Sequence, residues 1–189
     1  MIATMERELG PIDILVNSAG AAKRTPPDDL DPAAWRTAMD AKFFTYIHAI
    51  DPLIKRMAAR GRGIIVNVIG NGGKIASPTH IAGGAANAAL MLATAGLANA
   101  YATRGIRVVG INPGLTNTDR VAEGLRAEAR LTGTSPEEAL KRALARIPLG
   151  RMAEPQEIAR VVCFLASAQA SYISGATITM DGVATPTVV

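Results

Sequence analysis

The chain has 189 residues, of which 49% are hydrophobic and 19% are charged. This balance is typical of a folded domain and excludes a disordered chain, and the length fits one domain with a core of its own. The formal net charge of +4 comes from lysines and arginines scattered along the chain. We therefore expect no nucleic-acid partner, and we also expect no membrane-spanning segment.

The single cysteine and the first residues indicate the cellular compartment. One cysteine cannot form an internal disulfide, and Cys163 lies in an apolar helical pattern, so we expect a buried thiol. Charged side chains at Glu6, Arg7 and Glu8 stand where a signal peptide would be apolar. We therefore expect a cytoplasmic protein.

The first part of the chain predicts one strand between two helices. Asp28 or Asp31 could cap the second helix, and Pro52 should bend or divide it. The predicted elements are the end of a helix over Met1–Leu9, a strand over Ile12–Val16, a turn over Asn17–Gly20, a loop over Lys23–Pro32 and a long helix over Ala33–Arg60.

The stretch Gly63–Leu90 organises the rest of the chain. Its β-branched run Ile64–Ile69 is typical of a strand buried on both faces, as in a parallel sheet. The glycines at 70, 72 and 73 then form a loop that can bring backbone close to a ligand. A strand, a glycine loop and a helix form one step of a doubly wound fold, in which ligands lie beyond the carboxyl ends of the strands.

The remaining elements continue this alternation. They are a helix over Ala85–Ala102, a strand over Gly105–Ile111, helices over Asp119–Arg130, Ser135–Arg146 and Pro155–Ser167, and a strand over Gly175–Met180. Strands that alternate with helices predict an α/β fold, namely a Rossmann-like parallel sheet flanked by helices, in one domain over residues 1–189.

The order and spacing of several motifs resemble those of the classical short-chain dehydrogenase/reductase family. Asn17-Ser18-Ala19-Gly20 is similar to the family's Asn-Asn-Ala-Gly turn, and Asn112-Pro113-Gly114 to its Pro-Gly strand end. The resemblance implies an oxidoreductase that uses NAD or NADP on a carbonyl or alcohol. It also implies cofactor contacts from Asn17, Ala19, Gly20, Pro113, Gly114, Thr116 and Thr118.

The resemblance starts partway through the family's fold. Family members open with three strand–helix units that include the glycine-rich turn for the cofactor pyrophosphate, and this chain begins at the helix before the fourth strand. We therefore expect a partial Rossmann fold that lacks these units, with Ile12–Val16 as an apolar edge strand. A truncated or misplaced start, and a natural short form that protects this edge by self-association, both stay open.

The family's catalytic residues are replaced in this chain. Its asparagine, serine, tyrosine and lysine fall at Lys42, Gly70, Gly83 and Asn87, respectively. Glycine cannot donate a proton, whereas Lys42 and Asn87 exchange the family's amide and amine, either as a compensated pair or as two independent changes. Asn71 and His80 are the nearest other groups able to do chemistry, so we take Lys42, Asn87, Asn71 and His80 as catalytic candidates.

Three functions follow. The chain is a divergent oxidoreductase, a non-redox enzyme that reuses the pocket, or a non-catalytic nucleotide-binding or oligomerisation partner. By resemblance, residues 115–151 form the substrate lid, and the helices over 33–60 and 85–102 form the interface of a homodimer or homotetramer. No histidine, cysteine and carboxylate cluster has the spacing of a metal site, so we expect no metal.

Overall fold

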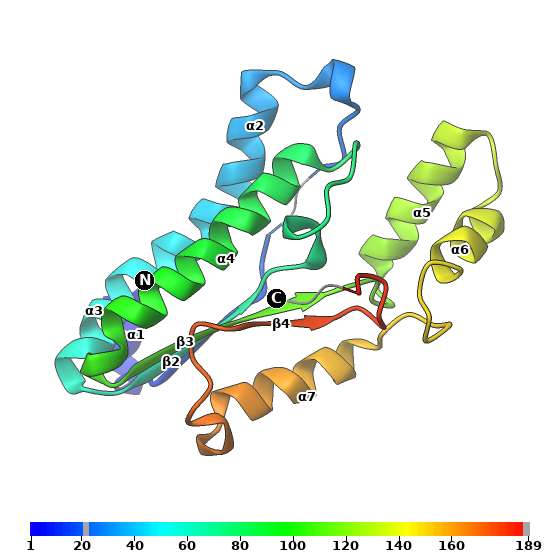
Figure 1. Ribbon diagram of the computed structural model, residues 1–189. Helices are drawn as coiled ribbons and strands as arrows, with labels where there is room; N and C mark the ends of the chain where they lie inside the picture. Colours follow the sequence, from blue (N-terminus) through cyan, green and yellow to red (C-terminus); the bar gives the residue numbers. More distant parts are fainter. Residues whose placement is uncertain (21–22, 187–189) are drawn as a thin grey trace.

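A computed structural model describes residues 1–20 and 23–186 as a parallel sheet between helices (Figure 1). The four strands follow one another in space as they do in the chain. They are β1 (Ile14–Asn17), β2 (Gly63–Val68), β3 (Ile106–Pro113) and β4 (Thr177–Met180). Every neighbouring pair is parallel. The prediction of a Rossmann-like parallel sheet flanked by helices is therefore confirmed.

Helices cover the two faces of this sheet unequally. The helices are α1 (Ile2–Leu9), α2 (Pro32–Ala38), α3 (Thr45–Arg60), α4 (Ile81–Tyr101), α5 (Asp119–Thr132), α6 (Pro136–Leu144) and α7 (Pro155–Ala166). In Figure 1, α3 and α4 lie on one side of the sheet and α7 on the other, while α5 and α6 lie beyond the carboxyl ends of the strands.

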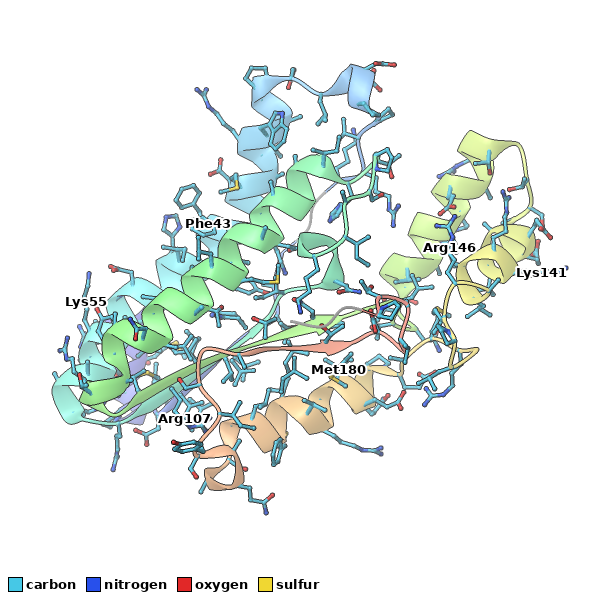
Figure 2. The ribbon with its side chains drawn as sticks, in the orientation of Figure 1. Phe43, Lys55, Arg107, Lys141, Arg146 and Met180 are labelled. Carbon is cyan, nitrogen blue, oxygen red and sulfur yellow. The ribbon has the colours of Figure 1, made fainter. Side chains whose placement is uncertain are left out.

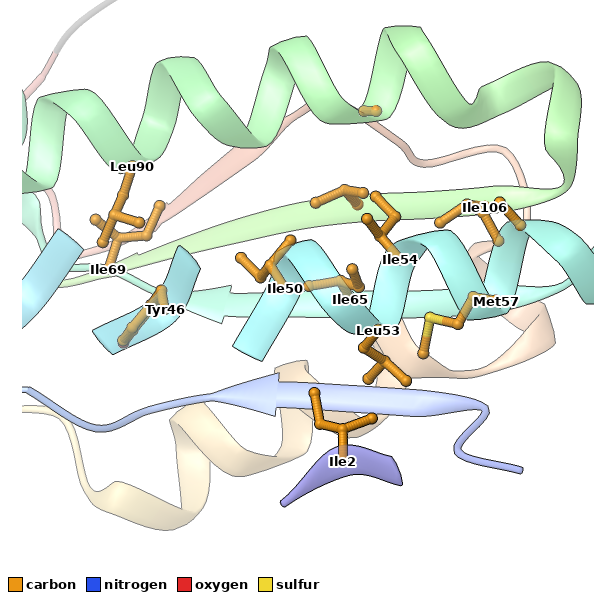
Figure 3. Packing of buried hydrophobic residues seen from close by; sticks show 13 residues of the cluster. Ile2, Tyr46, Ile50, Leu53, Ile54, Met57, Ile65, Ile69, Leu90 and Ile106 are labelled. Carbon is orange, nitrogen blue, oxygen red and sulfur yellow. The ribbon is translucent and has the colours of Figure 1, made fainter. Parts of the chain in front are cut away.

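The larger core lies between the sheet and α3 and α4 (Figure 3). Ile50 and Ile54 of α3 and Leu90 of α4 are at most 1% exposed. They pack with strand residues such as Ile65 and Val108, whose side chains point to this face. The smaller core, on the opposite face, joins Val66 and Val109 to α7. Alternate residues of one strand thus serve two cores, as expected for a strand buried on both faces.

The long helix predicted over residues 33–60 is divided, but not at Pro52. The break is a π-helical turn over Met39–Phe44, in which the Thr45 hydroxyl donates to the Asp40 carbonyl at 2.9 Å. Pro52 lies inside α3. Both Pro52 and His48, whose carbonyl the missing N–H would have bonded, are on the exposed side, where water can replace that bond. Of the two predicted caps, Asp31 is the one that accepts a hydrogen bond, from Ala34 N at 2.7 Å.

Helix α4 differs from its prediction in two respects. It begins at Ile81, four residues earlier than expected, with His80 at the cap position. The segment Ile81–Arg104 is also long and apolar enough, by length and composition alone, to cross a membrane, which we did not anticipate from the sequence. Leu90 and Ala86 are fully buried against the sheet, and a core helix meets the same criterion. Packing against the sheet therefore accounts for the buried side of α4, while other apolar residues, such as Leu92, stay exposed.

The face under α7 leaves apolar groups exposed. Cys163 is exposed, so the prediction of a buried thiol was wrong: α7 packs Ile158 and Leu165 into the core, while Cys163 borders a hollow beside Val16 of the partly uncovered β1. Ile14 and Val16 of β1 are 48% and 43% exposed. In the described part of the chain β1 is an edge strand, as the sequence predicted.

Candidate functional site

A polar hollow of about 290 Å³ opens beyond the carboxyl ends of β1, β2 and β3. This is the place where parallel α/β sheets bind ligands. Residues from six segments line the hollow: Ser18, Gly20, Lys42, Val68, Ile69, Gly70, His80, Asn87, Pro113 and Gly114. Lys42, His80 and Asn87 supply its ionisable and amide side chains, and none of the ten residues is acidic.

Lys42 reaches the hollow from the π-helical turn before α3. Its side chain is buried, and Nζ donates to the Tyr46 hydroxyl at 3.0 Å and to the Val68 carbonyl at 3.2 Å. The ammonium also lies 4.7 Å from the centre of the Tyr46 ring. Tyr46 is fully buried, donates its own proton to the Val68 carbonyl, and has a pKa raised by burial. The Tyr46 hydroxyl therefore stays neutral and holds Lys42 in place.

Close contact between the glycine loop and α4 forms another wall of the hollow. At Gly72 a Cβ would lie 2.9 Å from His80 Cδ2, and at Gly73 it would lie 2.7 Å from the backbone nitrogen of Ala88. Gly70 has φ of +120°, a conformation that L side chains rarely adopt. A serine at Gly70 would thus be strained, although its Cβ would only touch the Asn87 amide nitrogen, at 3.4 Å.

An apolar hollow of about 390 Å³ adjoins the polar one, and the two share Ser18, Val68 and Pro113. Its floor is the α7 face, and its other residues are Val16, Thr116, Thr118, Pro155, Ile158, Ala159, Val162 and Cys163. Thr118 also caps α5 by accepting a hydrogen bond from Val121 N at 3.4 Å. A ligand in this region would have a polar end near Lys42 and an apolar surface against α7.

Three of the four catalytic candidates come together in the polar hollow: Lys42, His80 and Asn87. The fourth, Asn71, is not among the lining residues. Its amide nitrogen instead donates to Asp181 Oδ2 at 2.7 Å and to the Thr185 hydroxyl at 2.8 Å, which ties the glycine loop to the end of the chain. Gly83, the tyrosine position of the resemblance, is buried in the first turn of α4.

The expected cofactor contacts separate into three groups. Gly20, Pro113 and Gly114 line the polar hollow, and Pro113, Thr116 and Thr118 line the apolar one. Ala19 is exposed in the turn after β1 and lines neither hollow.

Asn17, the remaining expected contact, has a structural role inside the fold. Its Nδ2 donates to Asn67 Oδ1 at 2.9 Å, Asn67 Nδ2 donates to the Thr94 hydroxyl at 3.0 Å, and that hydroxyl donates to the Leu90 carbonyl at 2.8 Å. This buried polar chain joins β1, β2 and α4, and every donor in it has an acceptor.

Sequence reasoning missed Tyr46, Ser18 and Val68. Tyr46 follows Lys42 by one helical turn, a spacing that would have indicated the contact. Nothing in the sequence marks the Val68 carbonyl, because any residue supplies one. Among the residues that the structure describes, no group of histidines, cysteines and carboxylates could hold a metal ion.

Comparison with known proteins assigns the family. A family profile described as enoyl-(acyl carrier protein) reductase matches residues 1–184. The chain is 36% identical over 184 residues to cis-4-hydroxycyclohexanecarboxylate dehydrogenase of Sinomonas cyclohexanicum, covering 95% of this chain and 70% of that protein. The chain belongs to the short-chain dehydrogenase/reductase family of oxidoreductases.

Further members of the short-chain dehydrogenase/reductase family agree in sequence and in fold. Acetoacetyl-CoA reductase of Rhizobium meliloti is 35% identical over 182 residues, which are 96% of this chain and 71% of that enzyme. Sorbitol-6-phosphate 2-dehydrogenase of Erwinia amylovora has a TM-score of 0.92 at 26% identity, over 97% of this chain and 73% of that one. An NADPH-dependent reductase involved in bacilysin biosynthesis has a TM-score of 0.91 at 27% identity, over 99% and 72%.

Proposed function

We propose that this chain is a divergent NAD(P)-linked oxidoreductase of a carbonyl or alcohol, in which Lys42, His80 and Asn87 replace the family's usual catalytic set. The observation that carries the proposal is the convergence of these three side chains, from three segments, on one hollow at the carboxyl ends of the strands. Family membership supports the reaction class.

The polar groups suit the charge changes of this reaction. During reduction of a carbonyl, negative charge develops on its oxygen, and fixed donors near that oxygen lower the barrier. The Lys42 ammonium is one such donor, and its hydrogen bonds to Tyr46 and to the Val68 carbonyl fix its position before a substrate arrives. The Asn87 amide is a second, neutral donor.

The apolar hollow fits the nicotinamide end of NAD(P). Pro113, Thr116 and Thr118 would hold the ring and its carboxamide, because they offer an apolar wall with hydroxyl groups beside it. A bound nicotinamide would supply or accept the hydride. In the described residues no glycine-rich loop precedes β1, so we assign no residue to the pyrophosphate.

The names of the relatives give the first substrates to test. One relative is named for a hydroxycyclohexanecarboxylate and the other for acetoacetyl-CoA. Both compounds carry a carbonyl or alcohol carbon that can be reduced or oxidised, together with an anionic group. A hollow with Lys42 and no acidic lining residue is compatible with such anions.

Two assays test this function. One follows oxidation of NADH or NADPH with acetoacetyl-CoA, and the other follows reduction of NAD⁺ or NADP⁺ with cis-4-hydroxycyclohexanecarboxylate. We expect Lys42→Met to lower kcat/KM by about 100-fold, because one fixed donor to the oxyanion is lost. Lys55→Met is the matched control. Lys55 extends from α3 on the exposed side (Figure 2), where it pairs only with Asp51 among described residues, and activity should be unchanged. Equal activity of the two variants would contradict the role of Lys42.

A second candidate is a partner that binds the nucleotide without turnover. The φ of +120° at Gly70 favours it, because the serine position of the family has here a backbone that serine would not readily adopt. Binding of NADPH with no hydride transfer to any carbonyl would select this function. Turnover that needs no nicotinamide would instead select a non-redox enzyme.

We also propose that the chain forms a homodimer or homotetramer in a cytoplasmic setting. The outer surface of α2, the π-helical turn and α4 carries exposed Trp35, Phe44 and Leu92, which are 38%, 39% and 77% exposed. Apolar side chains gathered in this way are typical of an interface. Sedimentation analysis of the purified chain measures its mass directly.

A further inference from the structure

We propose that His80 is the residue that exchanges a proton with the substrate oxygen, the task that a tyrosine performs in the related family members. This inference rests on the proposed function and assigns its proton-transfer step. It is drawn from the way in which the glycine loop and the start of α4 hold the imidazole at the hollow.

The backbone of His80 is fixed on both sides. Its N–H donates to the Ser77 carbonyl at 2.9 Å, and its own carbonyl accepts from Gly84 N at 2.7 Å. His80 is the cap residue of α4, a helix of 21 residues that packs along the sheet. A residue anchored to a rigid helix in this way has a defined position at the site, unlike one on a mobile surface loop.

Glycine at position 72 makes room for the imidazole ring. A Cβ there would lie 2.9 Å from His80 Cδ2, 3.3 Å from His80 Nε2 and 3.5 Å from the Asn87 amide nitrogen. Any side chain at 72 would therefore displace the ring or the loop. These distances also place His80 and Asn87 over the same point of the glycine loop.

Another close approach holds the loop against α4. At Gly84 a Cβ would lie 2.7 Å from the Gly72 carbonyl oxygen, so the loop can come this near only because residue 84 has no side chain. Gly84 is thus needed for the contact with the loop, and Gly72 for the neighbouring contact with His80. His80 lines the same hollow as Gly70 and Lys42.

An imidazole can transfer a proton, which Gly70 and Gly83, at the family's serine and tyrosine positions, cannot do. It can donate or accept a proton near neutral pH, and the His80 side chain is half-buried and lines the hollow. During reduction, hydride adds to the carbonyl carbon, and the electron pair of the C=O π bond moves to the oxygen. The oxygen then takes a proton from the imidazolium. In the reverse direction neutral imidazole removes the proton of the alcohol, while Lys42 stabilises the oxygen.

Proton transfer by histidine predicts opposite pH profiles for the two directions. Reduction needs imidazolium, so its rate should fall as pH rises through the pKa of the histidine, whereas oxidation needs neutral imidazole and should rise. The described charges around the site include the ammonium of Lys42 in the hollow and the guanidinium of Arg24, which bonds the Thr79 hydroxyl at 3.4 Å. At the glycine loop are also Lys74, which bonds the Thr179 hydroxyl, and Asp181, which accepts from Asn71. None of these side chains normally titrates near neutral pH.

The test compares His80→Gln and Gly72→Ala with the controls His48→Gln and Gly96→Ala. Because both controls lie on helices of the proposed interface, all four variants are compared with wild type at the same oligomeric state, set by sedimentation analysis. His48 is exposed on α3, and Gly96 is exposed on α4 with open space around it. With acetoacetyl-CoA and cis-4-hydroxycyclohexanecarboxylate as probes, we expect His80→Gln to lower kcat by about 100-fold in both directions and to remove both pH slopes. Gly72→Ala should lower kcat about tenfold, because it displaces the ring. The two controls should retain the wild-type rates and slopes.

Wild-type slopes retained in His80→Gln would overturn the assignment and leave the proposed function intact. Histidine NMR tests the assignment independently of turnover, since the chain has only two histidines. Addition of NADP⁺ and cis-4-hydroxycyclohexanecarboxylate should shift the imidazole signals that disappear in His80→Gln and leave those of His48 in place. A wild type without turnover but with this shift would remove the proposed function and keep His80 as a ligand contact. Absence of the shift would overturn the assignment.

Discussion

The two faces of the sheet differ in how tightly they are packed and in how much space they leave for a ligand. On one face α3 and α4 cover the strands with a large core, and the side chains that project into the polar hollow, Lys42 and Asn87, come from this layer. On the other face α7 alone covers β2 and β3, which leaves Ile14 and Val16 of β1 exposed. The densely packed face therefore positions the side chains of the polar hollow, and the sparsely covered face leaves space for a ligand.

The largest expected difference in stability comes from replacing one isoleucine by alanine on each face of the sheet. Ile50→Ala, at 1% exposure in α3, should lower the free energy of unfolding by about 2–5 kcal/mol, because it removes buried methyl groups and leaves a cavity. Ile14→Ala, at 48% exposure in β1, should cost less than about 1 kcal/mol. Urea denaturation measures both values. Similar losses would mean that the face under α7 is covered in solution.

A smaller effect should come from the buried polar chain between the sheet and α4. Thr94→Val removes the hydroxyl that accepts from Asn67, so a buried amide loses its partner, at a cost of about 1–3 kcal/mol. Thr132→Val is the control, because its hydroxyl makes the same type of bond, to the carbonyl four residues earlier, at an exposed site. If urea denaturation gives equal costs for the two variants, the bond from Asn67 contributes nothing.

The smallest expected effect is on the stability of the sparsely covered face, and it appears only at acidic pH. Arg151 donates two hydrogen bonds, of 2.7 and 2.8 Å, to Glu157 in the first turn of α7, and the Glu154 backbone N–H donates a third. The bonds from Arg151, followed by the bond from Glu154, lower the Glu157 pKa from 4.5 to about 2. Because the folded pKa is below the unfolded one, the stabilisation is complete above about pH 4.5 and is lost as pH falls toward 2.

Glu157→Gln should abolish that part of the pH dependence, whereas Arg151→Gln should remove only part of it, because the Glu154 N–H still donates to the Glu157 carboxylate at 2.8 Å. Thermal unfolding at several pH values between 2 and 6 would show the difference from wild type shrinking as the pH falls. A difference that stays constant over this range would show that the ion pair does not stabilise α7.

The sequence was sufficient for the fold and for part of the site. Hydrophobic runs such as Ile64–Ile69 identify buried strands because burial on both faces allows almost no polar residue. The approach of Lys42 and Asn87 to one hollow followed from the family resemblance, which already fixed the order of the strands. Their catalytic roles stay predictions.

Other features depended on contacts that no local pattern contains. Cys163 has apolar neighbours in sequence, but its exposure depends on which side of α7 meets the sheet and on how much of that side the strands cover. The bond from Asn71 to Asp181 joins residues 110 positions apart. Pro52 was expected to divide a helix, yet the break lies at Met39–Phe44, where nothing in the residue types marks a π-helical turn.

The π-helical turn over Met39–Phe44 determines how the chain before α3 is oriented relative to α3. A π-helical turn is equivalent to one residue inserted into an α-helix, so the residues before it are rotated relative to those after it by about 100°. Lys42 lies within this extra turn, whereas α3 beyond it keeps its apolar side on the sheet. Deletion of a single residue between Met39 and Phe44 would restore a regular helix and realign α2 with α3. The direction in which the Lys42 ammonium points is therefore encoded in the spacing of the chain as much as in the identity of the residue.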